Sequence, residues 1–228
     1  MSIERIRRKL SFPEENLNPP KSLVEPRDLG KFKYFINKHK DASFVICGCG
    51  ASLKNFDNFD NHITIGVNDA GRQIWCKYLV VVNTPNTFKW DRWKYVRDNT
   101  SECVFTHLPD LPMEDSKKVI VNLGKYGGID LENYGFIDYT TNSPYMAIII
   151  AYQMGASKIA IVGVDFTQNH FFADTGTHVV NRQIDQTMLE YSQLGKALTE
   201  KGIKIASLST ESMIESWPKM TLEEFETI

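Results

Sequence analysis

Two uninterrupted apolar runs constrain the fold of this chain more than any other feature. Residues 78–82 and 159–164 are apolar apart from one glycine, without the polar alternation of a strand that has one side in solvent. Such runs are typical of strands buried on both faces of a parallel sheet. Shorter strand patterns occur at residues 43–47, 62–68, 102–108, 118–123 and 204–208. Because helical patterns separate most of these strands, the sequence predicts an α/β fold: a single doubly wound, mostly parallel sheet in a Rossmann-like α/β/α arrangement.

The helical patterns complete this prediction and divide the chain. We expect helices at residues 31–40, 52–59, 87–98, 144–154, 180–201 and 222–227, and an edge strand at 134–139. Ser143 is expected to cap the fourth of these helices, with Pro144 at its first position. We assign residues 1–42 to an N-terminal arm and leading helix, 43–210 to the α/β domain, and 211–228 to a C-terminal helical tail.

The composition is that of an ordinary soluble globular protein, with 42% hydrophobic and 24% charged residues. The net charge of −2 implies no general attraction to nucleic acid or membranes. The cysteines form no Cys-x-x-Cys pair, so we expect reduced core residues in a cytoplasmic protein rather than a disulfide framework or a zinc site. No apolar run approaches the about 18 residues of a membrane span, so none is expected.

A glycine turn follows the first strand. Gly48 and Gly50 flank Cys49, and Ser52 opens a helical pattern directly afterwards. A strand, a glycine turn and a helix start can place backbone N–H groups around a phosphate. However, Leu53 occupies the third glycine position of the dinucleotide fingerprint, and the Gly-Lys-Ser/Thr ending of a P-loop is absent. The turn alone therefore fits either a phosphate cradle or close packing of a helix on the sheet.

Polar residues follow the strands where a ligand would bind. Asn68, Asn83 and Asp165 come at or after the ends of three predicted strands, and Ser143 starts a helix expected on the same rim. Ligands of doubly wound sheets bind at the carboxyl ends of the strands. Amide side chains both donate and accept hydrogen bonds, which suits ribose, sugar hydroxyls and base edges. Asn is also a common turn residue, so it is the grouping on one rim that favours a ligand site.

The chemistry available on this rim points to proton transfer. His178 precedes a predicted helix and could take a proton from an acceptor hydroxyl, although a surface or capping role fits it as well. Asp165 could contact a sugar or ribose hydroxyl or stabilise the following turn. The sequence contains no Asp-x-Asp motif and no clustered metal-ligand histidines, so no metal site is expected.

Several motifs in register resemble a known superfamily. They are residues 48–54 (Gly-Cys-Gly-Ala-Ser-Leu-Lys), 67–68, 82–85, 141–146 (Thr-Asn-Ser-Pro-Tyr-Met), 161–166 and 176–178 (Gly-Thr-His). Their order and spacing over residues 43–210 resemble bacterial sialyltransferases of glycosyltransferase family 42. They are equally similar to the related domain of motility accessory factors and 6-hydroxymethylpterin diphosphokinases.

The resemblance implies a nucleotide-binding transferase domain that needs no metal or other cofactor, with a nucleotide sugar, such as a CMP-sugar, as co-substrate. It implies His178 as the general base. The donor-binding residues that we expect are Gly48, Cys49, Gly50, Ser52, Asn68, Asn83, Asn142, Ser143, Asp165 and Thr167. Two departures stand out: Cys49 replaces a contact asparagine, and Thr167 and residues 171–172 stand where the family has two phosphate-stabilising tyrosines.

Three functions remain open at this point. The first is a metal-independent glycosyltransferase acting on an acceptor hydroxyl of a glycan, a protein or modified nucleic acid. The second is an ATP- and Mg²⁺-dependent diphosphokinase, for which Asp69 and Asp165 would be the metal ligands. The third is a non-catalytic nucleotide- or glycan-binding accessory protein. A homo-oligomer is compatible with each of them.

Overall fold

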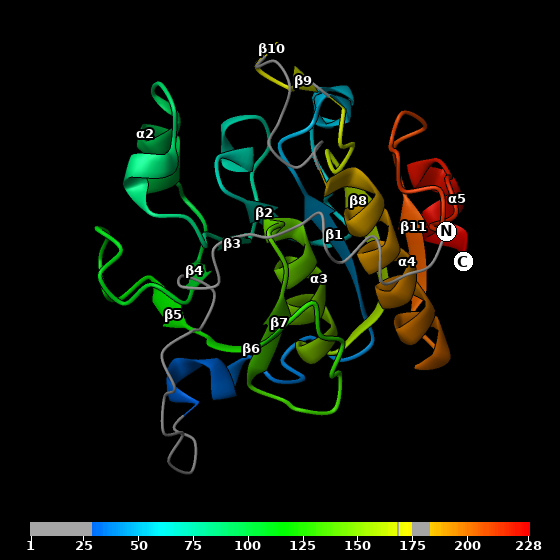
Figure 1. The fold of residues 1–228 in the computed structure, drawn as a ribbon, viewed down its shortest axis with the longest axis horizontal. Coiled ribbons are helices and arrows are strands. Elements are labelled where there is room, and N and C mark those ends of the chain that lie inside the picture. Colours follow the sequence, from blue (N-terminus) through cyan, green and yellow to red (C-terminus); the bar gives the residue numbers. More distant parts are fainter. Residues whose placement is uncertain (1–28, 168, 175–182) are drawn as a thin grey trace, which may run out of the picture.

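The computed structural model describes residues 29–167, 169–174 and 183–228. Its centre is a seven-stranded sheet with the order β11-β8-β1-β2-β3-β4-β5, and every neighbouring pair in it is parallel (Figure 1). The strands are β1 (Ala42–Cys47), β2 (Ile63–Val67), β3 (Tyr78–Val80), β4 (Cys103–Thr106), β5 (Lys118–Ile120), β8 (Ala156–Val162) and β11 (Lys204–Ser207). The predicted α/β class with a mostly parallel sheet is confirmed.

The strand order contains a reversal beside β1. The chain runs from β1 to β5 in one direction and then returns to place β8 and β11 on the other side of β1. In an open α/β sheet, such a switch point leaves a crevice at the carboxyl ends of the two diverging strands. The crevice between the ends of β1 and β8 is thus the place where a ligand site is expected in a sheet of this order.

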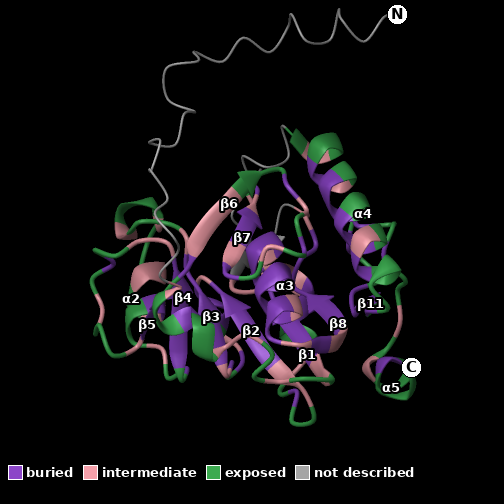
Figure 2. Cartoon of the chain, turned by 90° about the horizontal axis from the view of Figure 1, so that it is seen from below, coloured by how far each residue is buried: buried purple, intermediate pink, exposed green. Residues whose placement is uncertain are grey.

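The two faces of the sheet are covered differently. Helices α3 (Ser143–Gln153) and α4 (Ile184–Glu200) cover one face (Figure 1). The other face carries mostly short elements: η3 (Ala51–Asn55), η4 (Ala70–Arg72), α2 (Arg92–Arg97) and α5 (Leu222–Thr227). Helix α3 is buried along nearly its whole length, as its all-round apolar sequence predicts (Figure 2).

Several predicted helices are shorter than expected. The helix expected at 52–59 is the 3-10 turn η3, after which Phe56 is extended. The helix expected at 87–98 is only α2, preceded by the short 3-10 helix η5 (Pro85–Thr87), because Trp90 has a left-handed φ of 56° that breaks the helix. At 31–40 the chain forms η2 (Gly30–Tyr34) and turns. Helix α3 starts at Ser143, so Asn142 rather than Ser143 is its N-cap.

Two small sheets lie beside the main one. The edge strand expected at 134–139 is β7 (Phe136–Tyr139), which pairs in parallel with β6 (Asn122–Tyr126) outside the seven-stranded sheet. A hairpin of β9 (Asn169–His170) and β10 (Ala173–Asp174) lies above the carboxyl ends of the strands (Figure 1).

The last segment of the chain packs into the domain. Trp217 joins the core between α3, α4 and the sheet, and Phe225 of α5 joins the core on the other face. Thr221 and Glu224 form a capping box at the start of α5. No helix within the described ranges is long and apolar enough to cross a membrane.

Candidate functional site

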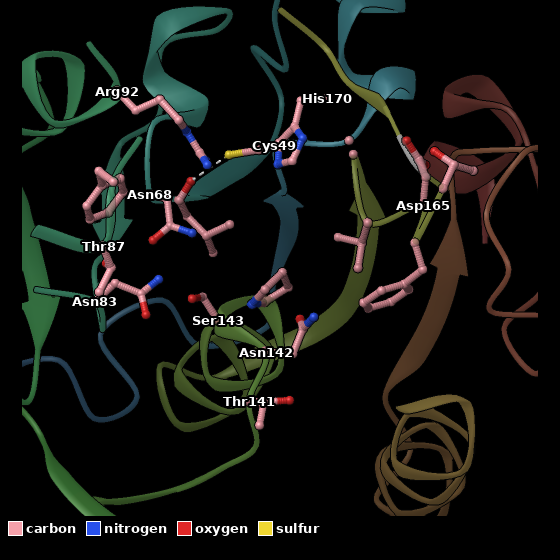
Figure 3. A pocket seen from close by; sticks show the side chains of 18 residues that line it. Cys49, Asn68, Asn83, Thr87, Arg92, Thr141, Asn142, Ser143, Asp165 and His170 are labelled. Carbon is pink, nitrogen blue, oxygen red and sulfur yellow. Dashed lines mark hydrogen bonds between the residues drawn. The ribbon is translucent and has the colours of Figure 1, made fainter. Parts of the chain in front are cut away.

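A pocket of about 420 Å³ lies at the carboxyl ends of β1, β2, β3 and β8, beside the start of α3 (Figure 3). This is the crevice at the switch point of the sheet. Eight of the ten expected donor-binding residues line it: Cys49, Gly50, Asn68, Asn83, Asn142, Ser143, Asp165 and Thr167. The structure therefore brings together polar residues that are spread over more than a hundred positions in sequence.

Gly48 and Ser52, the other two expected residues, do not line the pocket. A Cβ at Gly48 would stand 2.2 Å from the carbonyl oxygen of Gly163, and one at Gly50 would stand 2.5 Å from Oδ2 of Asp165. The glycines of the turn are thus required because the ends of β1 and β8 approach each other closely. This is close packing of two strand ends, not of a helix on the sheet.

Three backbone N–H groups of the glycine turn, which could have bound a phosphate, already donate to acceptors inside the protein. Gly48 N–H donates to the Val162 carbonyl at 2.8 Å, and Gly50 N–H to the Gly163 carbonyl at 2.6 Å. Ser52 N–H donates to Oδ2 of Asp165 at 2.8 Å. The turn consequently shapes the pocket through its backbone path, with these three amides committed to internal bonds.

Asp165 ties the end of β8 to the glycine turn. Its Oδ1 accepts a hydrogen bond from the Ser52 hydroxyl at 2.7 Å, and that hydroxyl accepts one from Gly163 N–H at 2.9 Å. Both Asp165 and Ser52 are buried. The structural role considered for Asp165 is therefore present, while the residue also borders the pocket.

Two lining residues have buried polar atoms without a hydrogen-bond partner among the described residues: Oδ1 of Asn68 and Oγ1 of Thr167. Asn68 also has a left-handed φ of 53°. Such an orphaned acceptor costs about 1–3 kcal/mol unless something else satisfies it. Strained and unsatisfied residues are typical of ligand sites, and these two atoms are natural contacts for hydrogen-bonding groups of a ligand.

The start of α3 is held in place from the helical layer. The hydroxyl of Tyr191, which is fully buried in α4, donates to Oδ1 of Asn142 at 2.8 Å. With its oxygen engaged in this way, Asn142 turns its Nδ2 donor group away from Tyr191. Burial raises the pKa of Tyr191 well above its usual range, so its hydroxyl keeps its proton and remains a donor.

Arg92 is a pocket residue that the sequence did not indicate. Its Nε lies 3.0 Å from both carboxylate oxygens of Asp69, and its Nη2 lies 2.5 Å from Oδ1. The Cys49 thiol lies within donating distance of two acceptors, this Oδ1 at 3.4 Å and the Val67 carbonyl oxygen at 3.3 Å. Burial opposes the charged guanidinium, but its bonds to Asp69 outweigh this and raise the pKa of Arg92. Burial, followed by the charge of Asp69, raises the pKa of Cys49 well above its usual range, so Cys49 is a thiol donor here.

The sequence did not indicate Arg92 because the helical pattern expected at 87–98 does not show which of its side chains faces the carboxyl ends of the strands. Thr87 and Phe88 also line the pocket and belonged to no motif, and Thr141, the first residue of the motif at 141–146, lines it as well.

One histidine of the hairpin reaches the pocket. His170 lines it, and the backbone of His170 forms an antiparallel bridge with Gly50, while Phe171 N–H donates to the Cys49 carbonyl at 3.1 Å (Figure 3). The hairpin is thereby fastened to the glycine turn. His178, the expected general base, lies in residues 175–182, outside the described residues.

The carboxylates proposed as Mg²⁺ ligands for the diphosphokinase both make hydrogen bonds inside the protein. Both oxygens of Asp69 accept from Arg92, and the two oxygens of Asp165 accept from the N–H and the hydroxyl of Ser52. Within the described ranges, no three His, Cys, Asp or Glu side chains come together in a group that could hold a metal ion.

No family model matches the sequence, and no curated protein is similar to it. Solved structures do resemble it. The sialyltransferase CstII from Campylobacter jejuni superimposes with a TM-score of 0.50 over 80% of this chain and 86% of its own, at 14% identity. The α-2,3-sialyltransferase Cst-I from the same organism gives 0.50 over 81% of this chain and 82% of its own, at 16% identity.

A third solved structure is the MAf glycosyltransferase from Magnetospirillum magneticum AMB-1. It gives a TM-score of 0.52 over 83% of this chain at 11% identity, and the chain spans only 37% of its length. At these identities the likeness concerns the fold. The resemblance inferred from the motifs is confirmed at that level: the chain has the fold of the family 42 sialyltransferases and of a motility accessory factor glycosyltransferase.

Proposed function

We propose that this chain is a glycosyltransferase and that its pocket binds the nucleotide of a nucleotide-sugar donor. The observation that carries the proposal is a pair of buried acceptors, on Asn68 and Thr167, that find no partner among the described residues and lie in a pocket at the switch point of the sheet. The amides of Asn83 and Asn142 line the same space. Such a set suits the hydroxyls of a ribose and the polar edge of a base.

The shared fold supports a cytidine nucleotide as the first candidate. Similar sialyltransferase structures contain CMP, and one of them holds it together with a trisaccharide acceptor. For this chain we propose a CMP-sugar as the donor to be tested first. The acceptor would be a hydroxyl group of a glycan, a protein or a modified nucleic acid.

The proposed reaction needs one base and no metal. His178 would take the proton of the acceptor hydroxyl while the acceptor oxygen forms a bond to the anomeric carbon. The bond between the anomeric carbon and the donor phosphate oxygen breaks, and the nucleotide leaves with that electron pair. The residues around Asn68 and Asn142 would hold the nucleotide during the transfer.

A thermal-shift panel with CMP, UDP, GDP and ATP tests the binding step, because a ligand that binds only the folded state stabilises it, by about 2.7 kcal/mol at a hundred times its Kd. We expect CMP to raise the melting temperature most. A preference for ATP together with a Mg²⁺ requirement and AMP as product would support the diphosphokinase instead. Binding without turnover across a panel of donor sugars would support the accessory protein. A panel in which no nucleotide stabilises the protein would overturn the proposal.

Asn68→Gly links that stabilisation to the pocket. Glycine tolerates the left-handed backbone of Asn68, so the variant removes the amide without adding strain. We expect the CMP-induced shift to shrink. Asn37→Gly is the matched control, since Asn37 has a similar φ of 54° and lies outside the pocket lining.

A further inference from the structure

Arg92 is the one permanent cation among the described residues that line the pocket. In Figure 3 it lies at the edge of the pocket near Cys49 and Asn68, on the far side from Asp165, the carboxylate of the lining. A bound anion would be attracted towards Arg92, whose charge Asp69 offsets in part from the other side of the guanidinium, and repelled by Asp165. The electrostatic potential in the pocket is therefore more positive on the side of Arg92 than on the side of Asp165.

The guanidinium is held rigidly in this position. Asp69, whose side chain is fully buried, takes up Nε and Nη2, and only 15% of the Arg92 side chain is exposed. The centre of the guanidinium lies 5.7 Å from the Phe88 ring and 5.2 Å from the Phe172 ring, within the range of cation–π contacts. Salt bridge and rings together fix both the position and the plane of the group.

This arrangement leaves one arm of the guanidinium available. Among the residues that the structure describes, no oxygen atom accepts a hydrogen bond from Nη1 of Arg92, whereas Nε and Nη2 both donate to Asp69. Arginine presents five N–H donors in a fixed fork, so fixing one side on a carboxylate orients the remaining donors. A phosphate oxygen is the strong, charged acceptor that such a group binds best.

We propose that Arg92 binds the phosphate of the donor nucleotide and selects phosphorylated ligands over the free nucleoside. The proposal rests on the proposed nucleotide-binding function. It assigns to Arg92 the recognition of the negative charge on the phosphate. Arg92 would also give this chain a cationic contact to the phosphate. The chain has Thr167, Phe171 and Phe172 in the region where the family has two phosphate-stabilising tyrosines. Asp69 and the Cys49 thiol behind it act as positioning residues.

The test compares nucleoside monophosphates with the matching nucleosides by calorimetry. CMP and cytidine are measured first, and the UMP, AMP and GMP pairs identify the base that the wild-type protein prefers. Arg92→Lys keeps a positive charge beside Asp69 but loses the second arm of the fork. We expect it to weaken monophosphate binding at least about tenfold while leaving nucleoside binding within about twofold.

Arg72→Gln is the matched control. Arg72 also stacks on the Phe172 ring, at 5.0 Å, but pairs with Asp91 on the surface and does not line the pocket. It therefore loses a comparable cation–π contact with the hairpin without touching the proposed phosphate site. We expect the ratio of monophosphate to nucleoside affinity to stay at the wild-type value in this variant.

Arg92→Gln removes the positive charge, but it leaves the buried Asp69 carboxylate without its partner. If this variant does not fold, it is combined with Asp69→Asn. An unchanged affinity ratio in folded Arg92→Lys overturns the proposal, even if both ligands bind more weakly, because a purely structural role would affect both alike. A wild-type protein that binds neither member of any pair overturns the proposed function and this proposal with it.

Discussion

The hydroxyl of Tyr191, in the middle of the helical layer, donates to Oδ1 of Asn142 at the pocket 2.8 Å away. The two residues are 49 positions apart in sequence. Because Tyr191 is fully buried against Tyr145, Phe166 and Trp217, the orientation of a pocket amide is set by the core of the protein.

Tyr191→Phe separates stability from binding. Losing this hydrogen bond is expected to lower the free energy of unfolding by about 1 kcal/mol and to weaken nucleotide binding, since Asn142 is no longer held in one orientation. Tyr145→Phe is the control, because its buried hydroxyl donates to the Gly128 carbonyl at 2.8 Å, away from the pocket lining. We expect a similar loss of stability there with unchanged affinity. Equal affinities in the two variants would contradict the role of Tyr191.

Gly163→Ala tests the close approach of the strand ends. Gly163 has a φ of 64°, and its Cβ would lie 2.6 Å from the Gly48 carbonyl oxygen. Gly202 has a φ of 80° with nothing within 4 Å of a Cβ. Both alanines should lose about 1–2 kcal/mol to backbone strain, and Gly163→Ala about 1–3 kcal/mol more to overpacking. Urea midpoints measure the difference; equal midpoints would show that the strand ends can move apart freely.

Ser52→Ala removes the link between the glycine turn and Asp165. The hydroxyl serves Asp165 and Gly163 N–H together, so its loss leaves a buried acceptor and a buried donor unpaired. We expect the free energy of unfolding to fall by about 1–3 kcal/mol. Ser116→Ala, at an exposed serine bonded to Glu114, should change it by less than about 0.5 kcal/mol. Denaturant unfolding of both variants measures this difference in the free energy of unfolding, and equal losses would contradict the role of the Ser52 hydroxyl.

His178→Ala tests the proposed base. Removing a general base should slow sugar transfer by about 10²–10⁴-fold while leaving nucleotide affinity unchanged. Single-turnover rates with a labelled donor, together with calorimetry, measure the two quantities separately. Turnover at the wild-type rate would remove His178 from the mechanism, and loss of nucleotide binding would indicate a structural role.

The stability of the protein should fall under mild acid. Burial lowers the pKa of His107 below its ordinary value of 6.5, and burial lowers the pKa of His39 and His62 too. Between the folded and unfolded pKa values the unfolded chain binds more protons, so the free energy of unfolding decreases as the pH falls below 6.5.

Chemical denaturation from about pH 7.5 to about pH 5.5 measures this slope. His107→Gln should make it shallower. The comparison with wild type isolates the histidine from Glu190, whose pKa is raised by burial and which acts with the opposite sign. Parallel slopes in wild type and variant would exclude a contribution from His107.

The sequence by itself determined the parallel sheet and most of the polar residues at its rim. The apolar run at 78–82 has to be buried on both sides whatever its neighbours are, and the polar residues at strand ends follow from the chain alone. Helix α5 likewise begins with its own capping box, so local sequence was enough to place it.

Tertiary structure alone decided which of these residues meet and what they do. Ser52 and Asp165 are 113 positions apart and bond only because β8 returns to lie beside β1. Arg92 enters the pocket because the left-handed backbone at Trp90 delays α2 and because Asp69 takes up the guanidinium. Strand order and side-chain pairing depend on contacts between distant segments. Local patterns of apolar and polar residues do not predict those contacts.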